Sequence, residues 1–261
     1  MTDKMLGEKD GVIGWLIFNN PERHNAVSQE MWVKAAQILD DFEADDAVRI
    51  VVLKGAGDKA FISGADISQF AERRDSAAAT AEYEKITAGA RRKLAAFPKP
   101  TVAMIDGYCL GGGLATALAC DLRLASERST FGIPAARLGL AYDAESIGRL
   151  LSVVGQAFVR EILFTGRRFS GEEAERMGLV HRLLSAGQLE PFTREYAETI
   201  AGNAPLTIRA VKVTLAELLK DPDQREPGRI EAANRACFDS ADYREGRTAF
   251  MEKRKPQFQG R

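Results

Sequence analysis

The segment Ile105–Ala119 reads IDGYCLGGGLATALA, and three consecutive glycines in it separate an apolar run from a series of small apolar residues. The run Thr101–Asp106 is typical of a buried strand, and the residues after Gly113 are typical of a helix. Glycines at a helix start let backbone N–H groups approach a negative charge, and they also permit tight packing of the helix on the strand. The segment therefore predicts a strand, a tight turn and a helix, and it leaves both roles of the glycines open.

Known glycine-rich nucleotide sites do not fit this segment. A P-loop requires Lys and then Ser or Thr directly after its last glycine, whereas Leu114 and Ala115 stand there. The dinucleotide fingerprint G-x-G-x-x-G is absent here and after Phe18, so NAD binding is not expected. No G-x-S-x-G elbow accompanies the two histidines, which argues against a serine hydrolase. His181 lies in a strand-like run and is expected to be structural, whereas His24 is either a polar loop residue or a ligand contact.

Composition and charge narrow the class of protein. The 261 residues are 45% hydrophobic and 28% charged, which is typical of a globular domain. The net charge of -1 indicates no general attraction to nucleic acid or to a membrane surface. The N-terminus lacks the apolar core of a signal peptide, and no apolar run reaches the roughly 20 residues that span a bilayer. Three scattered cysteines form neither a disulfide framework nor a zinc motif, so we expect a cytoplasmic protein without a metal site.

The pattern of apolar residues divides the chain into two parts. Up to about residue 185, short runs of β-branched apolar residues alternate with segments whose apolar residues recur at helical spacing. This alternation predicts an α/β core. The strand-like runs are Gly11–Phe18, Arg49–Leu53, Thr101–Asp106, Asp121–Ser126 and Gly178–Leu184. Ser28 is placed to cap a helix whose apolar stripe includes Ala36. After residue 187 the apolar residues keep a helical spacing, which is interrupted at Pro205, Pro222 and Pro227. We therefore predict a core over residues 1–187 and a helical region over residues 188–261, both in the same functional domain.

Several segments, taken in order, resemble the enoyl-CoA hydratase/isomerase (crotonase) superfamily. They cover nearly the whole chain, and the ordered set is far more specific than any one segment. The segments are NNPERHNAVS (19–28), KAFISGADIS (59–68), IDGYCLGGGLATALACDLRLAS (105–126), FGIPAARLGL (131–140), FTGRRFSGEEAERMGLVHRLL (164–184) and DYREGRTAFMEKRKPQF (242–258).

The resemblance implies a fold and a ligand. The fold is an α/β superhelix of repeated β-β-α units, with C-terminal helices that pack in trimers or dimers of trimers. The ligand is an acyl-CoA thioester, with no cofactor beyond its CoA moiety. In the family the thioester carbonyl lies between two backbone N–H groups, and the matching positions are Ala65 and Gly112. An oxyanion hole of this kind stabilises the enolate that forms from the thioester.

CoA-binding residues carry over in the same way. The backbone of the SGADIS segment matches one side of the CoA site in the family, and Arg23 is placed to meet the phosphates. In relatives, the residues that match Phe250 and Lys253 reach CoA from a neighbouring subunit. It is equally consistent with the sequence that Phe250 is a core residue of a helix and that Lys253 is a solvated surface charge. The implied CoA-binding set is Arg23, Gly64, Ala65, Asp66, Ile67, Ser68, Gly112, Phe250 and Lys253.

The chain departs from the family at the residues that activate water. Hydratases use two glutamates, and the matching positions are Ala115 and Ala135. Alanine transfers no proton, so hydration cannot follow its usual mechanism. Tyr142 matches a position used by a decarboxylase of the superfamily, and Asp143 matches one used by a dehalogenase and by a dienoyl-CoA isomerase. Asp143 is equally well placed to cap a helix, and Glu145 is a third candidate with a weaker match.

The sequence thus predicts an enzyme that stabilises a thioester enolate, with Tyr142 and Asp143 beside the oxyanion hole of Ala65 and Gly112. Isomerisation, decarboxylation and hydrolysis all use such a hole. Two other classes stay open: a CoA-binding scaffold without activity, and an RNA-binding relative, against which the balanced charge argues. The sequence does not give the acyl group, because the course of the loop expected over residues 70–87, a wall of the acyl pocket, is not predicted. It also gives no choice between trimer and hexamer.

Overall fold

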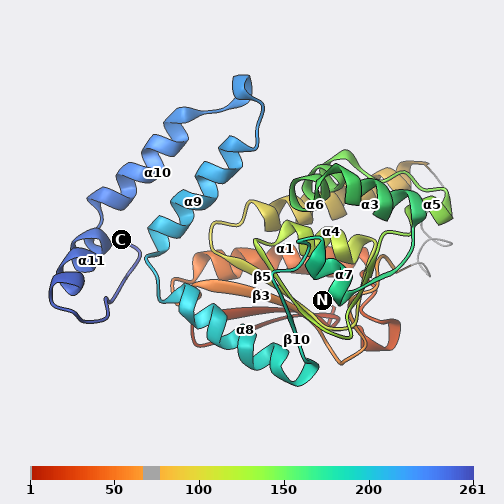
Figure 1. Ribbon diagram of the computed structural model, residues 1–261, viewed down its shortest axis with the longest axis horizontal. Helices are drawn as coiled ribbons and strands as arrows, with labels where there is room; N and C mark the ends of the chain where they lie inside the picture. The colour runs from red at the N-terminus through yellow and green to blue at the C-terminus, as the bar shows by residue number, and fades with distance from the viewer. Residues whose placement is uncertain (1, 67–76) are drawn as a thin grey trace.

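Two β-sheets and several helices form the main body of residues 2–66 and 77–261, which the computed structural model describes, with the backbone alone for 77–83 (Figure 1). The larger sheet has the strand order β1-β2-β3-β5-β7-β10, and only the β1–β2 pair in it is antiparallel. Its strands are β1 (Met5–Asp10), β2 (Ile13–Phe18), β3 (Ile50–Gly55), β5 (Thr101–Ile105), β7 (Leu122–Ser126) and β10 (Arg182–Leu184).

A smaller sheet adjoins the larger one. Its strands, in the order β4-β6-β8-β9, are β4 (Ala60–Ile62), β6 (Tyr108–Leu110), β8 (Thr130–Gly132) and β9 (Phe169–Ser170). The first three run parallel, and each follows a strand of the larger sheet along the chain. After each pair of strands come helices, namely α3 (Ala77–Ala95), α4 (Gly112–Ala119), and α5 (Ala135–Leu138) with α6 (Ala144–Thr165). This arrangement confirms the predicted superhelix of β-β-α units, and α3 replaces the last part of the loop expected over residues 70–87.

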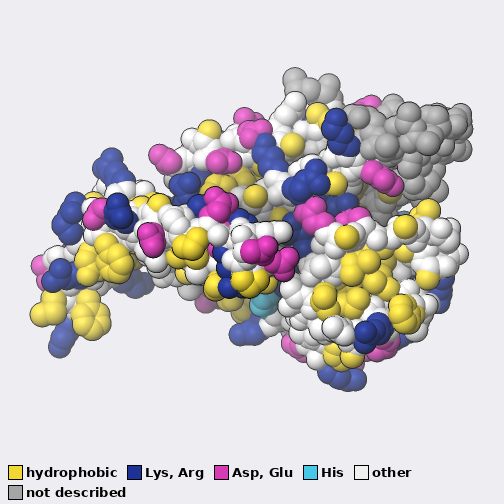
Figure 2. Space-filling view, turned by 90° about the horizontal axis from the view of Figure 1, so that it is seen from above, with side chains coloured by type: hydrophobic (Ala, Val, Ile, Leu, Met, Phe, Trp, Pro, Cys, Tyr) yellow, Lys and Arg dark blue, Asp and Glu magenta, His cyan; other side chains and the backbone are white. Residues whose placement is uncertain are grey.

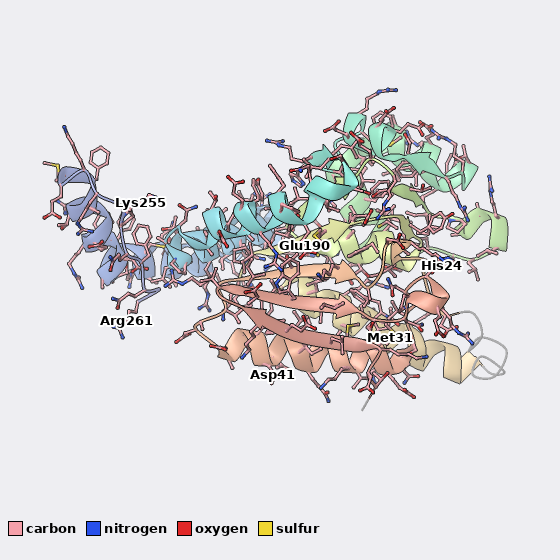
Figure 3. The ribbon with its side chains drawn as sticks, turned by 90° about the horizontal axis from the view of Figure 1, so that it is seen from below. His24, Met31, Asp41, Glu190, Lys255 and Arg261 are labelled. Atoms are coloured by element: carbon pink, nitrogen blue, oxygen red, sulfur yellow. The ribbon has the colours of Figure 1, made fainter. Side chains whose placement is uncertain are left out.

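Helix α1 (Gln29–Ala44) shows how the local sequence builds the core. The Ser28 Oγ accepts a hydrogen bond from the Met31 N–H at 3.3 Å, which caps the helix as predicted. The buried stripe of α1 packs on the larger sheet, and Ile38 rather than Ala36 completes it. Figure 3 labels Met31, which is buried, and Asp41, which lies on the exposed side of the same helix.

Helix α8 (Ala186–Ala201) packs on a second apolar cluster of the larger sheet, which contains Trp15. The Trp15 ring is 2% exposed, and its centre lies 4.7 Å from the Lys54 Nζ and 4.8 Å from the Arg194 guanidinium. Both cations also pair with Glu190 of α8 (labelled in Figure 3), so cation–π contacts, ion pairs and apolar burial hold this helix on the sheet. The division of the chain at residue 187 stays a prediction.

The last helices form an arm that extends from the body (Figure 1). The arm consists of α9 (Pro205–Leu218), α10 (Pro227–Asp239) and α11 (Ala241–Met251), with a short 3-10 turn (Pro222–Gln224) between the first two. The predicted proline interruptions therefore coincide with the first residues of these elements, where a missing N–H costs nothing. The Arg49 guanidinium donates to the Phe258 carbonyl oxygen at 2.5 Å, and the Lys212 ammonium pairs with Asp121 at 2.5 Å, so polar contacts tie the arm to the body.

The predicted strand over Gly178–Leu184 is right only for its last three residues, which form β10. His181 precedes them, and its N–H donates to the Arg123 carbonyl oxygen at 2.8 Å. The Nδ1 of His181 accepts from the Arg123 N–H at 3.1 Å, which confirms the structural role expected for this imidazole. Burial lowers the pKa of His181, and the Arg123 charge lowers it further, so the neutral imidazole is favoured.

Candidate active site

The predicted site lies at the carboxyl ends of three parallel strands. The strand β4 is followed by Gly64–Ala65, β6 by Gly111–Gly113, and β8 by Ala135. Because neighbouring parallel strands end at the same edge of a sheet, the topology brings these segments together. A hydrogen bond of 2.8 Å from the Gly111 N–H to the Gly132 carbonyl oxygen joins the ends of β6 and β8 directly.

The three glycines have different structural reasons. Gly111, which precedes helix α4, has a φ of +52°, a value that residues with side chains rarely adopt. Gly113 packs so closely on β4 that a Cβ there would lie 2.2 Å from the Ile62 carbonyl oxygen. A Cβ on Gly112 would meet no heavy atom of the described residues within 4 Å. The fold thus requires the first and third glycines, whereas it does not explain the small size of Gly112.

Ala65 directs its N–H away from the strand segment that it pairs with. It forms an isolated parallel bridge with Val27, in which the Val27 N–H donates to the Gly64 carbonyl oxygen at 2.9 Å. In the same bridge the Asp66 N–H donates to the Val27 carbonyl oxygen at 3.1 Å. The N–H of the middle residue in such a pairing points to the opposite side. On its own other side, Gly64 adjoins β6, since a Cβ on it would lie 3.6 Å from the Leu110 carbonyl oxygen.

The N–H groups of Ala65 and Gly112 have no acceptor among the residues that the structure describes. Gly112 is the first residue of α4, where N–H groups lack an intrahelical partner and the helix dipole adds positive partial charge. The close packing of Gly113 on Ile62 keeps the two segments adjacent. This arrangement suits a ligand oxygen that carries negative charge.

Ala115 and Ala135 occupy the positions where the resemblance implies glutamates. Ala115 is 3% exposed within α4, and its N–H donates to the Gly111 carbonyl oxygen at 3.1 Å. Ala135 begins α5 and packs against the core with its side chain partly buried. Both therefore lie beside the glycine turn, and neither supplies a group that transfers a proton.

Tyr142 reaches the glycine turn from the loop before α6. Its hydroxyl donates a hydrogen bond to the Gly111 carbonyl oxygen at 3.3 Å, and its ring packs against the main core. Burial raises the pKa of Tyr142 well above its ordinary value. The hydroxyl therefore stays protonated at neutral pH and acts as a hydrogen-bond donor rather than as a base.

Asp143 caps helix α6 and faces Arg91 of α3. Its Oδ1 accepts from the Ser146 N–H at 2.8 Å, which confirms the predicted cap, and its Oδ2 lies 3.7 Å from the Arg91 Nη2. Partial burial raises the pKa of Asp143, but the hydrogen bonds from Ser146 and the Arg91 charge outweigh burial, so the pKa lies below its ordinary value. The carboxylate is ionised at neutral pH, which suits a base or a nucleophile and not an acid. Glu145 instead forms an ion pair with Arg149 at 2.7 Å.

The residues predicted to bind CoA do not all come together in one chain. Arg23 pairs with the buried Asp66 at 3.2 Å, directly after Gly64–Ala65. Phe250 lies in the last turn of α11 with 80% of its surface exposed, and Lys253 follows this helix. Figure 1 shows α11 well separated from α4. Ile67 and Ser68 fall outside the described residues.

Arg91 is a residue at the site that the sequence did not indicate. It stands between other charged and small residues in GARRKLAAF, where several cations occur together. Its helical spacing was the available signal, because Arg91 lies three residues before the buried Leu94 and next to the buried Ala90. A cation on the buried side of a helix needs a partner or a ligand.

The other chemistry-bearing groups are structural or exposed. Among the described residues, no group of three or more His, Cys, Asp or Glu side chains is close enough to hold a metal ion. Burial raises the pKa of the Cys120 thiol to about 12, so the thiol is protonated and unreactive. His24 is exposed, with its ring edge-on to Tyr108 at 5.9 Å between centres. Within residues 2–66 and 77–261, no helix has the length and apolar character needed to cross a membrane.

Comparisons with known proteins cover nearly the whole chain. The sequence profile of the enoyl-CoA hydratase/isomerase family matches residues 8–261. This chain belongs to the enoyl-CoA hydratase/isomerase family. It is 32% identical over 257 residues to the short-chain-enoyl-CoA hydratase of Clostridium acetobutylicum, and the match covers 97% of this chain and 96% of that protein.

Further members of the enoyl-CoA hydratase/isomerase family agree over the full length. The crotonyl-CoA hydratase of Syntrophomonas wolfei is 30% identical over 256 residues, which is 98% of each protein. The crystal structure of an enoyl-CoA hydratase/carnithine racemase from Magnetospirillum magneticum has a TM-score of 0.94 at 33% identity, with 100% of this chain and 97% of that chain covered. The predicted crotonase-type fold is therefore confirmed, and the chain is an enzyme of this family.

Proposed function

We propose that this enzyme binds an acyl-CoA and stabilises the enolate of its thioester between the N–H groups of Ala65 and Gly112. The observation that carries the proposal is a pair of N–H groups at the adjoining ends of β4 and β6 that have no acceptor in the described part of the chain. The space beside Gly112 admits a thioester oxygen, and the first turn of α4 adds positive partial charge. Donors fixed by the backbone in this way stabilise a developing oxyanion more than a ground-state carbonyl.

The reaction that we propose differs from the addition of water. Ala115 and Ala135 hold no proton, whereas Asp143 offers an ionised carboxylate and Tyr142 a protonated hydroxyl. In an isomerisation, Asp143 would remove a proton from the acyl chain and return it to another carbon. Decarboxylation passes through the same enolate, and hydrolysis passes through an oxyanion that the same donors stabilise. The resemblance of the Tyr142 and Asp143 positions to those of other family branches supports these reactions equally.

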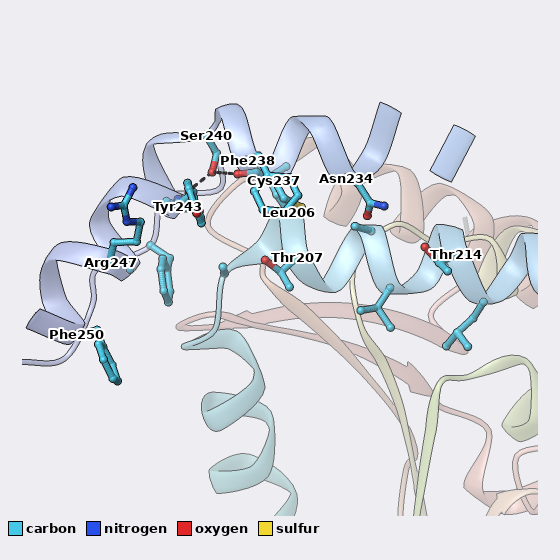
Figure 4. A pocket seen from close by; sticks show the side chains of 17 residues that line it. Leu206, Thr207, Thr214, Asn234, Cys237, Phe238, Ser240, Tyr243, Arg247 and Phe250 are labelled. Atoms are coloured by element: carbon cyan, nitrogen blue, oxygen red, sulfur yellow. Dashed lines mark hydrogen bonds between the residues drawn. The ribbon is translucent and has the colours of Figure 1, made fainter. Parts of the chain in front are cut away.

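We also propose that the arm joins copies of this chain into a trimer or a dimer of trimers. A mostly apolar cavity of about 750 Å³ lies between α9, α10 and α11, with Tyr243 and Phe250 toward one end (Figure 4). Figure 2 shows apolar side chains gathered at the end of the arm, where Phe250 and Met251 are largely exposed. Contact with a second copy would remove this apolar surface from water. Phe250 and Lys253 would then approach CoA bound to the neighbouring chain.

Titration calorimetry tests the proposed function. Acetyl-CoA or a longer acyl-CoA is expected to bind, whereas NAD and ATP are expected to bind little. Folded protein that binds no acyl-CoA would contradict the proposal. Turnover over a panel of acyl-CoA thioesters then separates an enzyme from an inactive scaffold, and a salt-dependent shift of RNA would support the RNA-binding alternative.

Asp143→Asn is expected to lower turnover about 10²-fold on the acyl-CoA that the panel identifies, with little change in the melting temperature. Asn keeps a capping oxygen for the Ser146 N–H but loses the negative charge. The loss is expected at the low end of the range for proton transfer, because a lowered pKa makes Asp143 a weak base. Asp143→Ala, measured beside it, also removes the cap and is expected to lose about 1 kcal/mol of stability. Full turnover by Asp143→Asn would leave Asp143 as a cap alone.

A further inference from the structure

Arg91 is a nearly buried cation with a weak partner. Its side chain is 16% exposed, and among the described residues it has one ion-pair partner, Asp143, whose Oδ2 lies 3.7 Å from the Arg91 Nη2. This separation exceeds the roughly 2.7–3.2 Å of an N–H···O hydrogen bond. No hydrogen bond joins the Arg91 guanidinium to any residue that the structure describes. A guanidinium presents a fork of N–H donors, and within residues 2–66 and 77–261 those of Arg91 have no hydrogen-bond acceptor.

The Arg91 guanidinium lies beside the residues proposed to carry the reaction. Helix α3, which holds Arg91, packs against α4, which begins at Gly112. The ion-pair partner of Arg91, Asp143, directly follows Tyr142 in the chain; burial raises the pKa of Tyr142, and the charge of Arg91 opposes this rise. The Tyr142 hydroxyl is hydrogen-bonded to Gly111, the residue before the proposed oxyanion donor. A short series of contacts therefore connects Arg91 to the position of the thioester.

We propose that Arg91 binds a carboxylate on the acyl group, so that the substrate is a carboxyacyl-CoA. This inference rests on the proposed acyl-CoA function. A planar guanidinium binds a carboxylate through two parallel N–H···O bonds, which is a stronger arrangement than the loose contact that Arg91 makes with Asp143. Because the Arg91 side chain is only 16% exposed, the guanidinium loses little of its own hydration when such a group binds, and the cost of desolvation falls on the carboxylate. An uncharged acyl chain would leave these donors unused, and this difference would select the substrate.

A purely structural role, in which Arg91 only joins α3 to α6, has different consequences. The neighbouring Arg92 supplies the comparison, since its Nη1 lies 3.6 Å from the Glu145 Oε2 of α6 while its side chain is 57% exposed. Both arginines thus bridge the same two helices at similar distances, but only Arg91 is withdrawn from solvent. A structural bridge affects the melting temperature and not the choice of acyl group, whereas a substrate contact affects the choice.

Affinities for matched pairs of thioesters test the proposal. Succinyl-CoA and butyryl-CoA have acyl groups of equal carbon number and differ in the terminal carboxylate; malonyl-CoA with propionyl-CoA and glutaryl-CoA with valeryl-CoA vary its distance. The wild-type protein is expected to bind the charged member of at least one pair about tenfold or more tightly, as one charge-assisted contact implies. Arg91→Gln is expected to lose that preference and keep its affinity for the uncharged member, whereas Arg92→Gln keeps both. Arg91→Lys keeps the positive charge but loses the forked guanidinium donors, and it is expected to keep part of the preference for the charged thioester.

The outcomes separate this inference from the proposed function. Equal affinities within all three pairs, or a preference that persists in Arg91→Gln, would overturn the role of Arg91 and leave acyl-CoA binding intact. Failure to bind either member of any pair would contradict the proposed function itself. If Arg91→Gln does not fold, equal affinities in the wild-type protein still overturn the proposal, and Arg91→Lys assigns the residue: a reduced preference supports Arg91, and an undiminished one contradicts its role.

Discussion

Crotonyl-CoA is expected to be hydrated by this enzyme at least about 10⁴-fold more slowly than by a hydratase of the family, since two acid/base groups are missing and each contributes roughly 10²–10⁴. Ala115 is buried in α4 and Ala135 lies against the core, so no carboxylate occupies either position. Loss of enoyl absorbance at saturating crotonyl-CoA gives the rate, with the Clostridium acetobutylicum hydratase as the reference. A rate comparable with the reference would show that other residues activate water.

Restoring one carboxylate makes this prediction sharper. The side chain of Ala135 is partly exposed at the start of α5, whereas Ala115 lies in a filled interior where a larger side chain would be overpacked. Ala135→Glu is therefore expected to raise crotonyl-CoA hydration by roughly tenfold or more, below the full effect of a general base because the second glutamate is still absent. The matched control is Ala136→Glu, the same change at the exposed next residue, which is expected to have no effect.

Gly112→Pro is expected to reduce kcat/KM by roughly 10²–10³-fold, the cost of removing one oxyanion donor. Proline has no N–H, and the first position of a helix accepts its fixed φ, so the fold should persist. The proline Cβ would meet no described heavy atom within 4 Å. A thioester of para-dimethylaminocinnamic acid gives a second readout, because its absorbance moves to longer wavelength when its carbonyl is polarised. This shift is expected with the wild-type protein and lost in Gly112→Pro.

Gly112→Ala is the matched control for the donor. It keeps the N–H and places one methyl group where no described atom lies within 4 Å. We expect the bound chromophore to keep its shift in this variant, with weaker binding if the methyl group touches the ligand. Full turnover and an unchanged shift in a folded Gly112→Pro protein would exclude Gly112 as a donor.

Sequence reasoning succeeded for the strands built from consecutive apolar residues, and it missed both the smaller sheet and β1, whose residues are mostly polar and exposed. The runs that became β2, β3, β5 and β7 contain enough consecutive apolar residues to be recognised as buried strands. The smaller sheet was not predicted, since β4, β6 and β8 have three residues each and are strands only because neighbours distant in sequence pair with them. Likewise, α3 was hidden in a segment without a clear apolar stripe.

The candidate site divides in a similar way. The resemblance pointed to Ala65 and Gly112, but the distinct reasons for Gly111, Gly112 and Gly113 depend on β4 and on backbone angles that no local pattern contains. The direction in which the pKa of Asp143 shifts also could not be predicted from the sequence. It depends on Arg91, which belongs to another helix and meets Asp143 only in the folded chain.

The main-chain N–H and carbonyl groups of Gly111 hold the site together, and this residue has no side chain to contribute. Its N–H donates to Gly132, and its carbonyl oxygen accepts from the Ala115 N–H and the Tyr142 hydroxyl. In the proposed function the groups that polarise the thioester are likewise main-chain atoms, and of the common substitutions only proline removes a main-chain N–H. Side chains that move protons can then be exchanged while the backbone N–H donors stay in place. This chain is therefore a favourable starting point for directed evolution. Libraries at positions 115, 135, 142 and 143 would sample new reactions while every variant retained the same activated carbonyl.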